Sequence, residues 1–212
     1  MRLVIISDTH GLHDRMEPLP DGDVLIHAGD VSNVGRPTEI KKFTEWFNDQ
    51  TFFQHRIWIG GNHDWALQHF MEAGEEKMID DISRPAHYLR DRGICIDGVN
   101  FYGSPWQPTF CDWAFNLNRG RWLKEKWDLI PANTDVLITH GPPMGILDHV
   151  GRERVGCWDL MNRVMEVKPK VHCFGHIHCA YGQAFLNGTT YINAAVCTEV
   201  YKPQNAPTVV DI

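Results

Sequence analysis

Several features that define other classes of protein are missing from this sequence. No apolar run approaches the roughly 18 residues of a membrane-spanning helix. The six cysteines include no Cys-x-x-Cys pair, so we expect reduced and mostly structural thiols. Positive charge is also scarce, because the formal net charge is −7, and a long contact with duplex nucleic acid needs a basic surface. We therefore expect a cytoplasmic protein that contacts no membrane and forms no stable complex with nucleic acid.

The composition is that of a globular protein. The chain has 212 residues, of which 43% are hydrophobic, and it contains eight tryptophans. This length suits one domain with a substantial core, and no internal repeat or second boundary is evident, so we expect a single domain over residues 1–212. The apolar stretch Leu3–Ile6 is too short for a signal peptide and indicates a buried strand rather than a leader.

Short apolar runs alternate with segments of helical periodicity, which predicts an α/β fold that begins with parallel strands. The expected strands are Leu3–Ile6, Asp23–Ala28, Arg56–Ile59, Thr134–Thr139 and Lys170–Phe174. The expected helices are Pro37–Asn48, Trp65 to about Ala73, Arg121–Leu129 and Cys157–Val167. Asp97-Gly98 and Asn187-Gly188 are hairpin turn signals, so the second half should be more antiparallel. Residues 74–84 are interpreted as a polar connection.

Polar side chains follow each of five predicted strands at the point where the strand ends. Ligands bind at that rim in open α/β sheets, because the strand ends and their loops form a crevice there. The groups are Asp8, His10, Asp30, Asn62, His63, His140, His176 and His178. This set is too large for one ion, since a zinc site is complete with three or four ligands. Imidazole, carboxylate and amide donors suit a pair of divalent ions, for which we expect Mn²⁺, with Fe, Zn²⁺, Co²⁺ or Ni²⁺ as alternatives.

The order of these motifs resembles that of the calcineurin-like, or class III, metallophosphoesterases. The matching blocks are Asp8-Thr9-His10, Gly29-Asp30, Gly61-Asn62-His63-Asp64, His140 and Gly175-His176-Ile177-His178. Five blocks in the correct order make chance coincidence remote. Further segments resemble the metallophosphoesterase-domain-containing subfamily, namely Gly103–Trp106, Trp113–Phe115, Thr139–Pro143 and Tyr191–Ala194.

The resemblance implies a four-layer α/β/β/α sandwich of two mixed sheets around a dinuclear metal centre. By position, the first ion would be held by Asp8, His10, Asp30 and His178. The second would be held by Asp30, Asn62, His140 and His176, with Asp30 bridging. His63 would remain off the metals, beside the phosphate that it and Asn62 bind. The expected reaction is in-line attack by a metal-bridging hydroxide, with His63 as the acid that protonates the leaving alkoxide.

The substrate expectation comes from a departure within the second block. Protein phosphatases of this superfamily continue Gly-Asp with x-x-Asp-Arg-Gly, whereas Val31–Gly35 contains no arginine. Small phosphodiesters, with cyclic nucleotides as test substrates, are therefore favoured over phosphoproteins. His176 is present where some animal members of the subfamily carry glycine, which favours a fully dinuclear site. The alternatives are a nuclease on short oligonucleotides, a phosphomonoesterase, or a binding module without catalysis.

For other residues near the expected metal centre, the sequence allows more than one role. Trp106 is a candidate substrate wall, although packing of Trp106 and Trp113 beneath their loop is slightly favoured. Asp64 either orients His63 or caps the next helix, and the cap is favoured. His27 is interpreted by default as a surface or satisfied core histidine, and it is the likeliest of these to support the metal ligands, because it lies on the strand that leads to Asp30. Four arginines are interpreted as surface charges that could alternatively hold a phosphate: Arg119, Arg121, Arg152 and Arg154. The sequence does not determine the oligomeric state.

Overall fold

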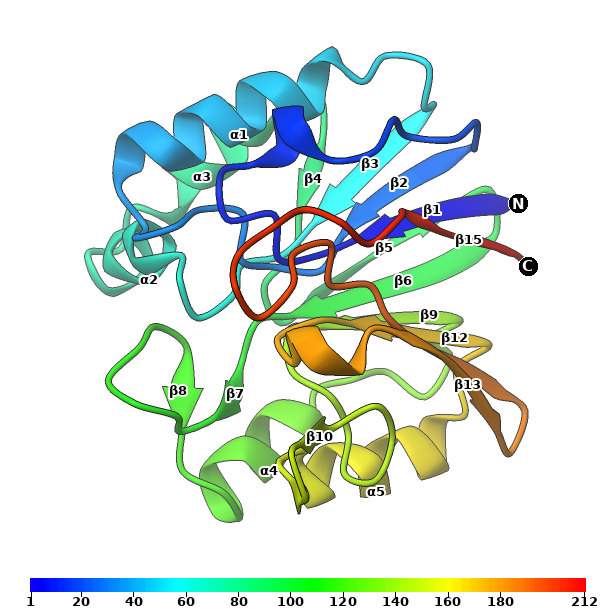
Figure 1. Cartoon of the computed structure of the whole chain (residues 1–212). Helices are drawn as coiled ribbons and strands as arrows, with labels where there is room; N and C mark the ends of the chain where they lie inside the picture. Colours follow the sequence, from blue (N-terminus) through cyan, green and yellow to red (C-terminus); the bar gives the residue numbers. More distant parts are fainter.

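The computed structural model describes residues 1–212 and arranges them in four layers, with two sheets between two layers of helices (Figure 1). Helices α1 (Pro37–Asp49), α2 (Trp65–Glu72) and α3 (Glu76–Ser83) lie on the outer side of the first sheet. Helices α4 (Arg121–Trp127) and α5 (Trp158–Val167) cover the second. The expected α/β/β/α sandwich is confirmed.

The first sheet is parallel except at one edge. Its order is β15-β1-β2-β3-β4, and only β15 runs antiparallel, against β1. The strands are β1 (Arg2–Ile6), β2 (Val24–His27), β3 (His55–Trp58), β4 (His87–Tyr88) and β15 (Thr208–Asp211). Ile6 lies opposite His27, and His27 lies opposite Trp58, so the turns that follow β1, β2 and β3 leave the sheet side by side.

The second sheet has four parallel strands between two antiparallel edges. Its order is β13-β14-β12-β9-β6-β5. The strands are β5 (Arg92–Ile96), β6 (Val99–Ser104), β9 (Val136–Thr139), β12 (Val171–Phe174), β13 (Gly182–Leu186) and β14 (Thr189–Asn193). The predicted hairpins at Asp97-Gly98 and Asn187-Gly188 are confirmed, because β5 pairs with β6 and β13 pairs with β14 in antiparallel fashion.

Alternation of side chains along the strands divides the core into two parts. A cluster of 16 buried residues, including Ile5, Ile26 and Val136, comes from the strands of both sheets and the residues flanking them, and fills the space between the sheets. A larger cluster of 28 residues, including Leu25 and Trp58, packs against the helices. Since both faces of each sheet are covered, the central strands are continuous apolar runs.

Some elements were not expected from the sequence. The supposedly polar connection folds as α3, whose Ile79 is buried, and β15 at the C-terminal end adds an edge strand to β1. Short elements also occur in the loops: η1 (His13–Arg15), β7 (Gln107–Pro108), β8 (Asn116–Leu117), β10 (His149–Val150), β11 (Glu153–Arg154) and η2 (His178–Ala180). None of the helices combines the length and apolarity needed to cross a membrane.

Candidate metal centre

The polar strand ends of the two sheets converge on one place. The sheets are joined there, because Ser7 after β1 pairs with Ala195 after β14. Four of the expected ligands have left-handed backbone conformations, with φ of 55° at Asp8, 47° at His10, 56° at Asp30 and 67° at His176. Such conformations are costly for residues with a Cβ and cluster at functional sites. Hydrogen bonds between neighbouring turns hold them, from Asp8 N to the Gly29 carbonyl (2.9 Å) and from His10 N to the Asp30 carbonyl (3.0 Å).

One group of possible ligands consists of Asp8, His10 and His178, whose ligand atoms all lie within 4.8 Å of one another. The Nε2 atoms of His10 and His178 are 3.2 Å apart, and Asp8 Oδ1 lies 3.3 Å from His178 Nε2. His178 Nδ1 donates to the Thr198 carbonyl at 3.0 Å, which leaves Nε2 directed toward the group. Such a partner fixes the tautomer of a metal-binding histidine.

A second group consists of Asp30, His140 and His176, again within 4.8 Å. Asn62 adds an amide oxygen, with Oδ1 2.9 Å from His140 Nε2. His140 Nδ1 donates to the Ala28 carbonyl at 3.0 Å, so its Nε2 also faces the cluster. All the residues expected to hold metal are therefore brought together from loops that are up to 170 positions apart in the chain (8 to 178).

Asp30 lies between the two groups. Its Oδ2 is 3.4 Å from His140 Nε2 in one group and 3.9 Å from His10 Nε2 in the other. Its other oxygen, Oδ1, accepts a hydrogen bond from the backbone N–H of His63 at 2.8 Å. One carboxylate oxygen thus faces both groups while the second is held by the backbone.

Two glycines make room for the carboxylates. A Cβ on Gly175 would lie 1.9 Å from Asp8 Oδ2, and a Cβ on Gly61 would lie 2.3 Å from Asp30 Oδ1. Both approaches are far below any van der Waals distance. The glycines of the Gly61 and Gly175 blocks are therefore required for space at these positions.

The protonation of the cluster fits a site for cations. Burial lowers the pKa of His10 and His176 to about 4, so both are neutral at pH 7 and offer a lone pair. At His140 and His178 burial is outweighed by Asp30 and Asp8 respectively, and the pKa of each rises to about 9. Burial would raise the pKa of Asp8 and Asp30, but the neighbouring histidines hold both well below their usual range. Buried carboxylates balanced by protonated imidazoles are groups that could hold divalent cations, which would replace those protons.

His63 is fixed from three sides. Its Nδ1 donates to the Asn33 carbonyl at 2.6 Å, its ring stacks on Trp113 with centroids 4.3 Å apart and planes at 25°, and its edge meets His10 at 4.5 Å. Because Nδ1 is occupied, Nε2 is the ring nitrogen left for other chemistry. His63 also forms a third cluster with His10 and Asp30, within 4.8 Å. The sequence placed Trp113 beneath a loop, and the stacking on His63 was not foreseen.

Asp64 has neither of its expected roles. Asp64 precedes α2, but its side chain makes no cap and accepts instead from Gly61 N (2.8 Å), Ser32 N (3.0 Å) and Val31 N (3.2 Å). It makes no hydrogen bond with the His63 ring, and it ties the Asp30 and Asn62 loops together. Burial and the charge of Asp30 raise its pKa to about 6. His27 is a buried and satisfied histidine, as expected: it is hydrogen-bonded to Thr9 Oγ1 (2.9 Å) and accepts from Gly29 N (3.2 Å), and both partners lie next to expected ligands in the chain.

Trp106 does not fit the role of a substrate wall. Its indole N–H donates to Asp91 at 2.8 Å, Lys126 lies over the ring at 4.5 Å, and the side chain is buried. The alternative of packing under the loop describes Trp106 correctly.

Arg119 lines the cavity that opens onto the cluster, but its two terminal nitrogens donate to the Gly156 and Val155 carbonyls at 2.6 Å each.

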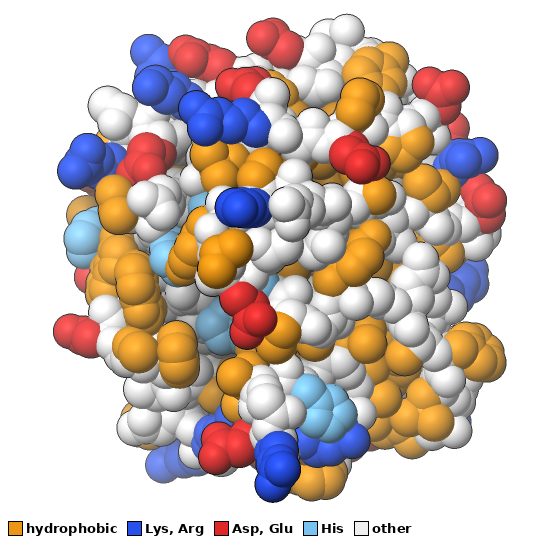
Figure 2. Space-filling model, viewed as in Figure 1, with side chains coloured by type: hydrophobic (Ala, Val, Ile, Leu, Met, Phe, Trp, Pro, Cys, Tyr) orange, Lys and Arg blue, Asp and Glu red, His pale blue; other side chains and the backbone are white.

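A cavity of about 490 Å³ opens onto the cluster and includes Asp30, Asn62, His63, His176 and His178 in its lining. Histidine side chains show between hydrophobic ones in a hollow on the left of the face in Figure 2. Two carboxylates, Glu153 and Glu199, also line the cavity. The cluster is therefore accessible to a small ligand.

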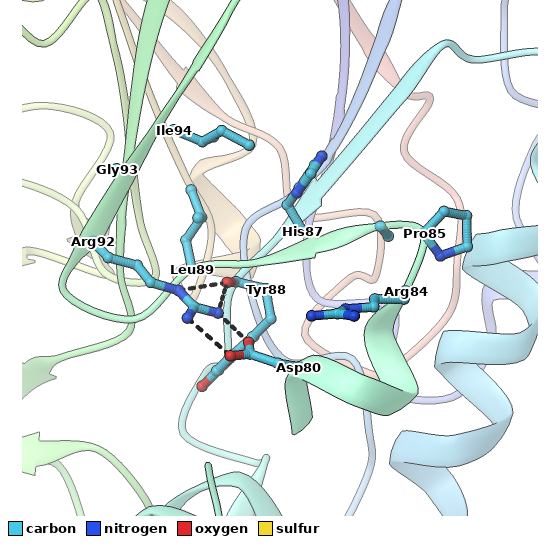
Figure 3. A pocket seen from close by; sticks show the side chains of 10 residues that line it. Asp80, Arg84, Pro85, His87, Tyr88, Leu89, Arg92, Gly93 and Ile94 are labelled. Carbon is cyan, nitrogen blue, oxygen red and sulfur yellow. Dashed lines mark hydrogen bonds and ion pairs between the residues drawn. The ribbon is translucent and has the colours of Figure 1, made fainter. Parts of the chain in front are cut away.

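A second cavity, of about 800 Å³, lies beside the edge strands β4 and β5 (Figure 3). Its most prominent polar feature is the pairing of the Arg92 guanidinium with Asp80 and the Tyr88 carbonyl. It contains none of the expected site residues and no cluster of possible metal ligands. We interpret this ion pair as structural.

Comparisons with known proteins agree with the geometry. The family model described as calcineurin-like phosphoesterase matches residues 1–180. The human metallophosphoesterase domain-containing protein 1 is 44% identical over 232 aligned residues, which cover 100% of this chain and 71% of the human protein. A 3′,5′-cyclic-nucleotide phosphodiesterase of Nostoc is 24% identical, over 77% of this chain and 59% of its own length.

The fold is also similar to a solved structure, that of TT1561 from Thermus thermophilus. The TM-score is 0.63 at 12% identity, with 91% of this chain and 88% of the other covered. This likeness supports the fold alone. The match of the family model, together with the identity and coverage of the alignment with the human relative, shows that this chain belongs to the calcineurin-like phosphoesterases.

Proposed function

We propose that this protein is a dinuclear metal-dependent phosphodiesterase that hydrolyses small phosphodiesters, with cyclic nucleotides among its substrates. Its family is one of metal-dependent phosphoric ester hydrolases, and its histidine and aspartate groups could hold metal. The proposal adds the number of ions, the type of ester and the roles of individual residues.

The position of Asp30 is the observation that carries the proposal. Two cations about 3.5–4 Å apart need an anion between them. Asp30 Oδ2 faces His10 and His140, each of which belongs to a different group of ligands. We assign Asp8, His10, Asp30 and His178 to one ion and Asp30, Asn62, His140 and His176 to the other. Mn²⁺ is the expected metal, and this donor set also suits Fe, Zn²⁺, Co²⁺ or Ni²⁺.

Bound ions would supply Lewis acidity toward the phosphate oxygens. They would also lower the pKa of a metal-bound water to about 7. The residues of the chain would then orient the ester and manage the proton. His63 is held by Asn33 and Trp113 beside the cluster, with Nε2 free to donate to the leaving oxygen. That donation matters most for alkoxides, which are poor leaving groups. Asn62, next to it in the chain, also lines the cavity and would contact the substrate.

The charges around the cavity favour a diester over a monoester. A phosphodiester carries one negative charge, whereas a phosphomonoester carries nearly two at neutral pH. The lining contains Glu153 and Glu199, and its one arginine, Arg119, already donates to two backbone carbonyls. A dianion would therefore find few partners beyond the ions. The name of the Nostoc relative is consistent with cyclic nucleotides as substrates.

The test compares metal-free protein with protein reloaded with Mn²⁺. Substrates are bis-p-nitrophenyl phosphate, p-nitrophenyl phosphate, 2′,3′- and 3′,5′-cyclic AMP and a short single-stranded oligonucleotide. We expect turnover of the diesters that chelator abolishes, and two ions per chain by elemental analysis. Turnover that resists chelator would contradict the metal mechanism, and a preference for p-nitrophenyl phosphate would contradict the diester assignment.

A pair of variants tests the acid. His63→Ala should reduce hydrolysis of cyclic AMP by about 10²–10⁴-fold, the usual contribution of general acid catalysis, with two ions still bound. His55→Ala is the matched control, because His55 begins β3 at the end opposite Asn62 and His63. Full activity of His63→Ala on cyclic AMP would remove His63 from the mechanism.

A further inference from the structure

We propose that Phe110 and Tyr201 form two binding surfaces for planar groups, one for each ester arm of the substrate. The substrate class is then a phosphodiester that carries an aryl group or a nucleobase. This inference rests on the proposed function, because it takes the phosphate to bind at the metal cluster. Both side chains line the cavity that opens onto that cluster.

Tyr201 lies beside the first group of ligands. Its ring centroid is 4.7 Å from that of His10 and 5.6 Å from that of His178. His63 is slightly farther, at 6.1 Å. The ring nevertheless remains 44% exposed, so much of it is free to contact a ligand.

The turn that presents Tyr201 is held tightly. Tyr201 has a φ of 55°, an unfavourable conformation for an aromatic residue, and its N–H donates to the Thr198 carbonyl at 2.8 Å. The Thr198 N–H donates in turn to the Lys202 carbonyl at 2.9 Å. His178 Nδ1 uses the same Thr198 carbonyl, at 3.0 Å. One turn therefore orients both a metal ligand and the ring next to it.

Phe110 lies beside the second group. Its centroid is 6.0 Å from that of His176 with the rings at 80°, and 57% of the side chain is exposed. The loop between β7 and β8 that carries it is fixed, because Asn116 Nδ2 donates to the Phe110 and Cys111 carbonyls at 3.1 and 3.2 Å. Ala114 N also donates to the Asn62 carbonyl at 3.0 Å, which ties the loop to the cluster.

The placement of the two rings matches the shape of a diester. Each ring lies beside a different group of ligands, and a phosphate that contacts both groups projects its two ester arms away from them. Exposed aromatic faces bind planar groups by stacking, and this contact tolerates different bases or aryl groups. A monoester would leave one ring unused. A linear diester with two planar groups would use both, whereas a cyclic nucleotide, with one base, would use one.

The experiment measures binding rather than turnover. Diphenyl phosphate and dimethyl phosphate have the same charge and differ in their aryl arms. Calorimetry on the Mn²⁺-loaded full chain should show diphenyl phosphate binding at least about tenfold more tightly. Phe110→Ala and Tyr201→Ala should each weaken the binding of diphenyl phosphate about fivefold or more and leave the affinity for dimethyl phosphate unchanged. Phe110→Tyr and Tyr201→Phe, which keep the rings, should bind like the wild type.

Phe185→Ala is the control, since Phe185 on β13 is 73% exposed and does not line the cavity. Equal affinity of the wild type for the two esters would overturn the inference. So would unchanged binding of diphenyl phosphate in both alanine variants. If these predictions hold but no diester is hydrolysed, the proposed function is wrong and the binding surfaces are supported. If diesters are hydrolysed but aryl esters bind no more tightly, the proposed function is supported and the binding surfaces are wrong.

Discussion

Metal binding should release protons in a number that the structure specifies. His140 and His178, one in each group, have a pKa of about 9 in the absence of metal because Asp30 and Asp8 stabilise their charged forms against the effect of burial. His10 and His176 have a pKa of about 4 and carry no proton at neutral pH. Since a coordinated imidazole must be neutral, each ion should displace about one proton.

The magnitude is clearest at pH 8. Two groups with a pKa of about 9 are each about nine-tenths protonated there, so binding of two ions should release about 1.8 protons. Four imidazoles with an ordinary pKa near 6.5 would release only about 0.1. Between pH 6 and pH 8 the affinity for each ion should also rise about tenfold per pH unit, because one proton competes with each ion.

Isothermal titration calorimetry of Mn²⁺ into metal-free protein measures this release directly. The titration is run at pH 8 in two buffers that differ in ionisation enthalpy, and the slope of the heat against that enthalpy gives the proton number. His178→Ala should lower the release by about one proton along with the affinity for one ion. Two bound ions with less than half a proton released would refute the assigned protonation of His140 and His178.

Three other perturbations have defined outcomes. Gly175→Ala places a Cβ 1.9 Å from Asp8 Oδ2 and should reduce the bound metal from two ions to one or none by elemental analysis; two ions at wild-type affinity would contradict the packing. Trp113→Leu removes the stack on His63 and should slow hydrolysis of alkyl esters at least about tenfold more than that of p-nitrophenyl esters, and an equal effect on both would mean that the indole does not position the acid. Burial lowers the pKa of His27 to about 3, so the unfolded state takes up a proton below pH 6.5 that the folded state does not. This stability is present above pH 6.5 and is lost as the pH falls, by about 1 kcal/mol between pH 6.5 and 5.5 and by nearly 1.4 kcal/mol per pH unit below that. In urea unfolding of metal-free protein, the free energy of unfolding should fall more between pH 6.5 and 5.5 in the wild type than in His27→Gln. An equal fall in both proteins would contradict this account of His27.

The sequence predicted the features that local pattern and strand direction determine. Parallel strands place their carboxyl ends on one edge, so residues as distant as Asp8 and His178 could be assigned to one site before any geometry was known. The hairpins at Asp97-Gly98 and Asn187-Gly188 followed from turn chemistry that depends on two neighbouring residues.

Contacts between distant segments were not predictable in the same way. Helix α3 (Glu76–Ser83) was missed for a different reason: Met78, Ile79 and Ile82 have the spacing of one helical face, but the many charges around them led to the interpretation as a connection, and Ile79 is buried in the larger core cluster. Asp64 has the position of a helix cap, but the backbone N–H groups of Val31 and Ser32 lie within reach and bind its carboxylate instead. The approach of Tyr201 to the cluster likewise depends on a turn that packs beside His10 and His178, and no local pattern in the sequence indicates that contact.

The bridging role of Asp30 is tested most directly by a crystal structure of the Mn²⁺-loaded protein with anomalous diffraction recorded at the manganese edge. We predict two anomalous peaks about 3.5–4 Å apart, with Asp30 in contact with both, one beside His10 and one beside His140. A single peak at saturating Mn²⁺, or two peaks with Asp30 bound to neither, would contradict it.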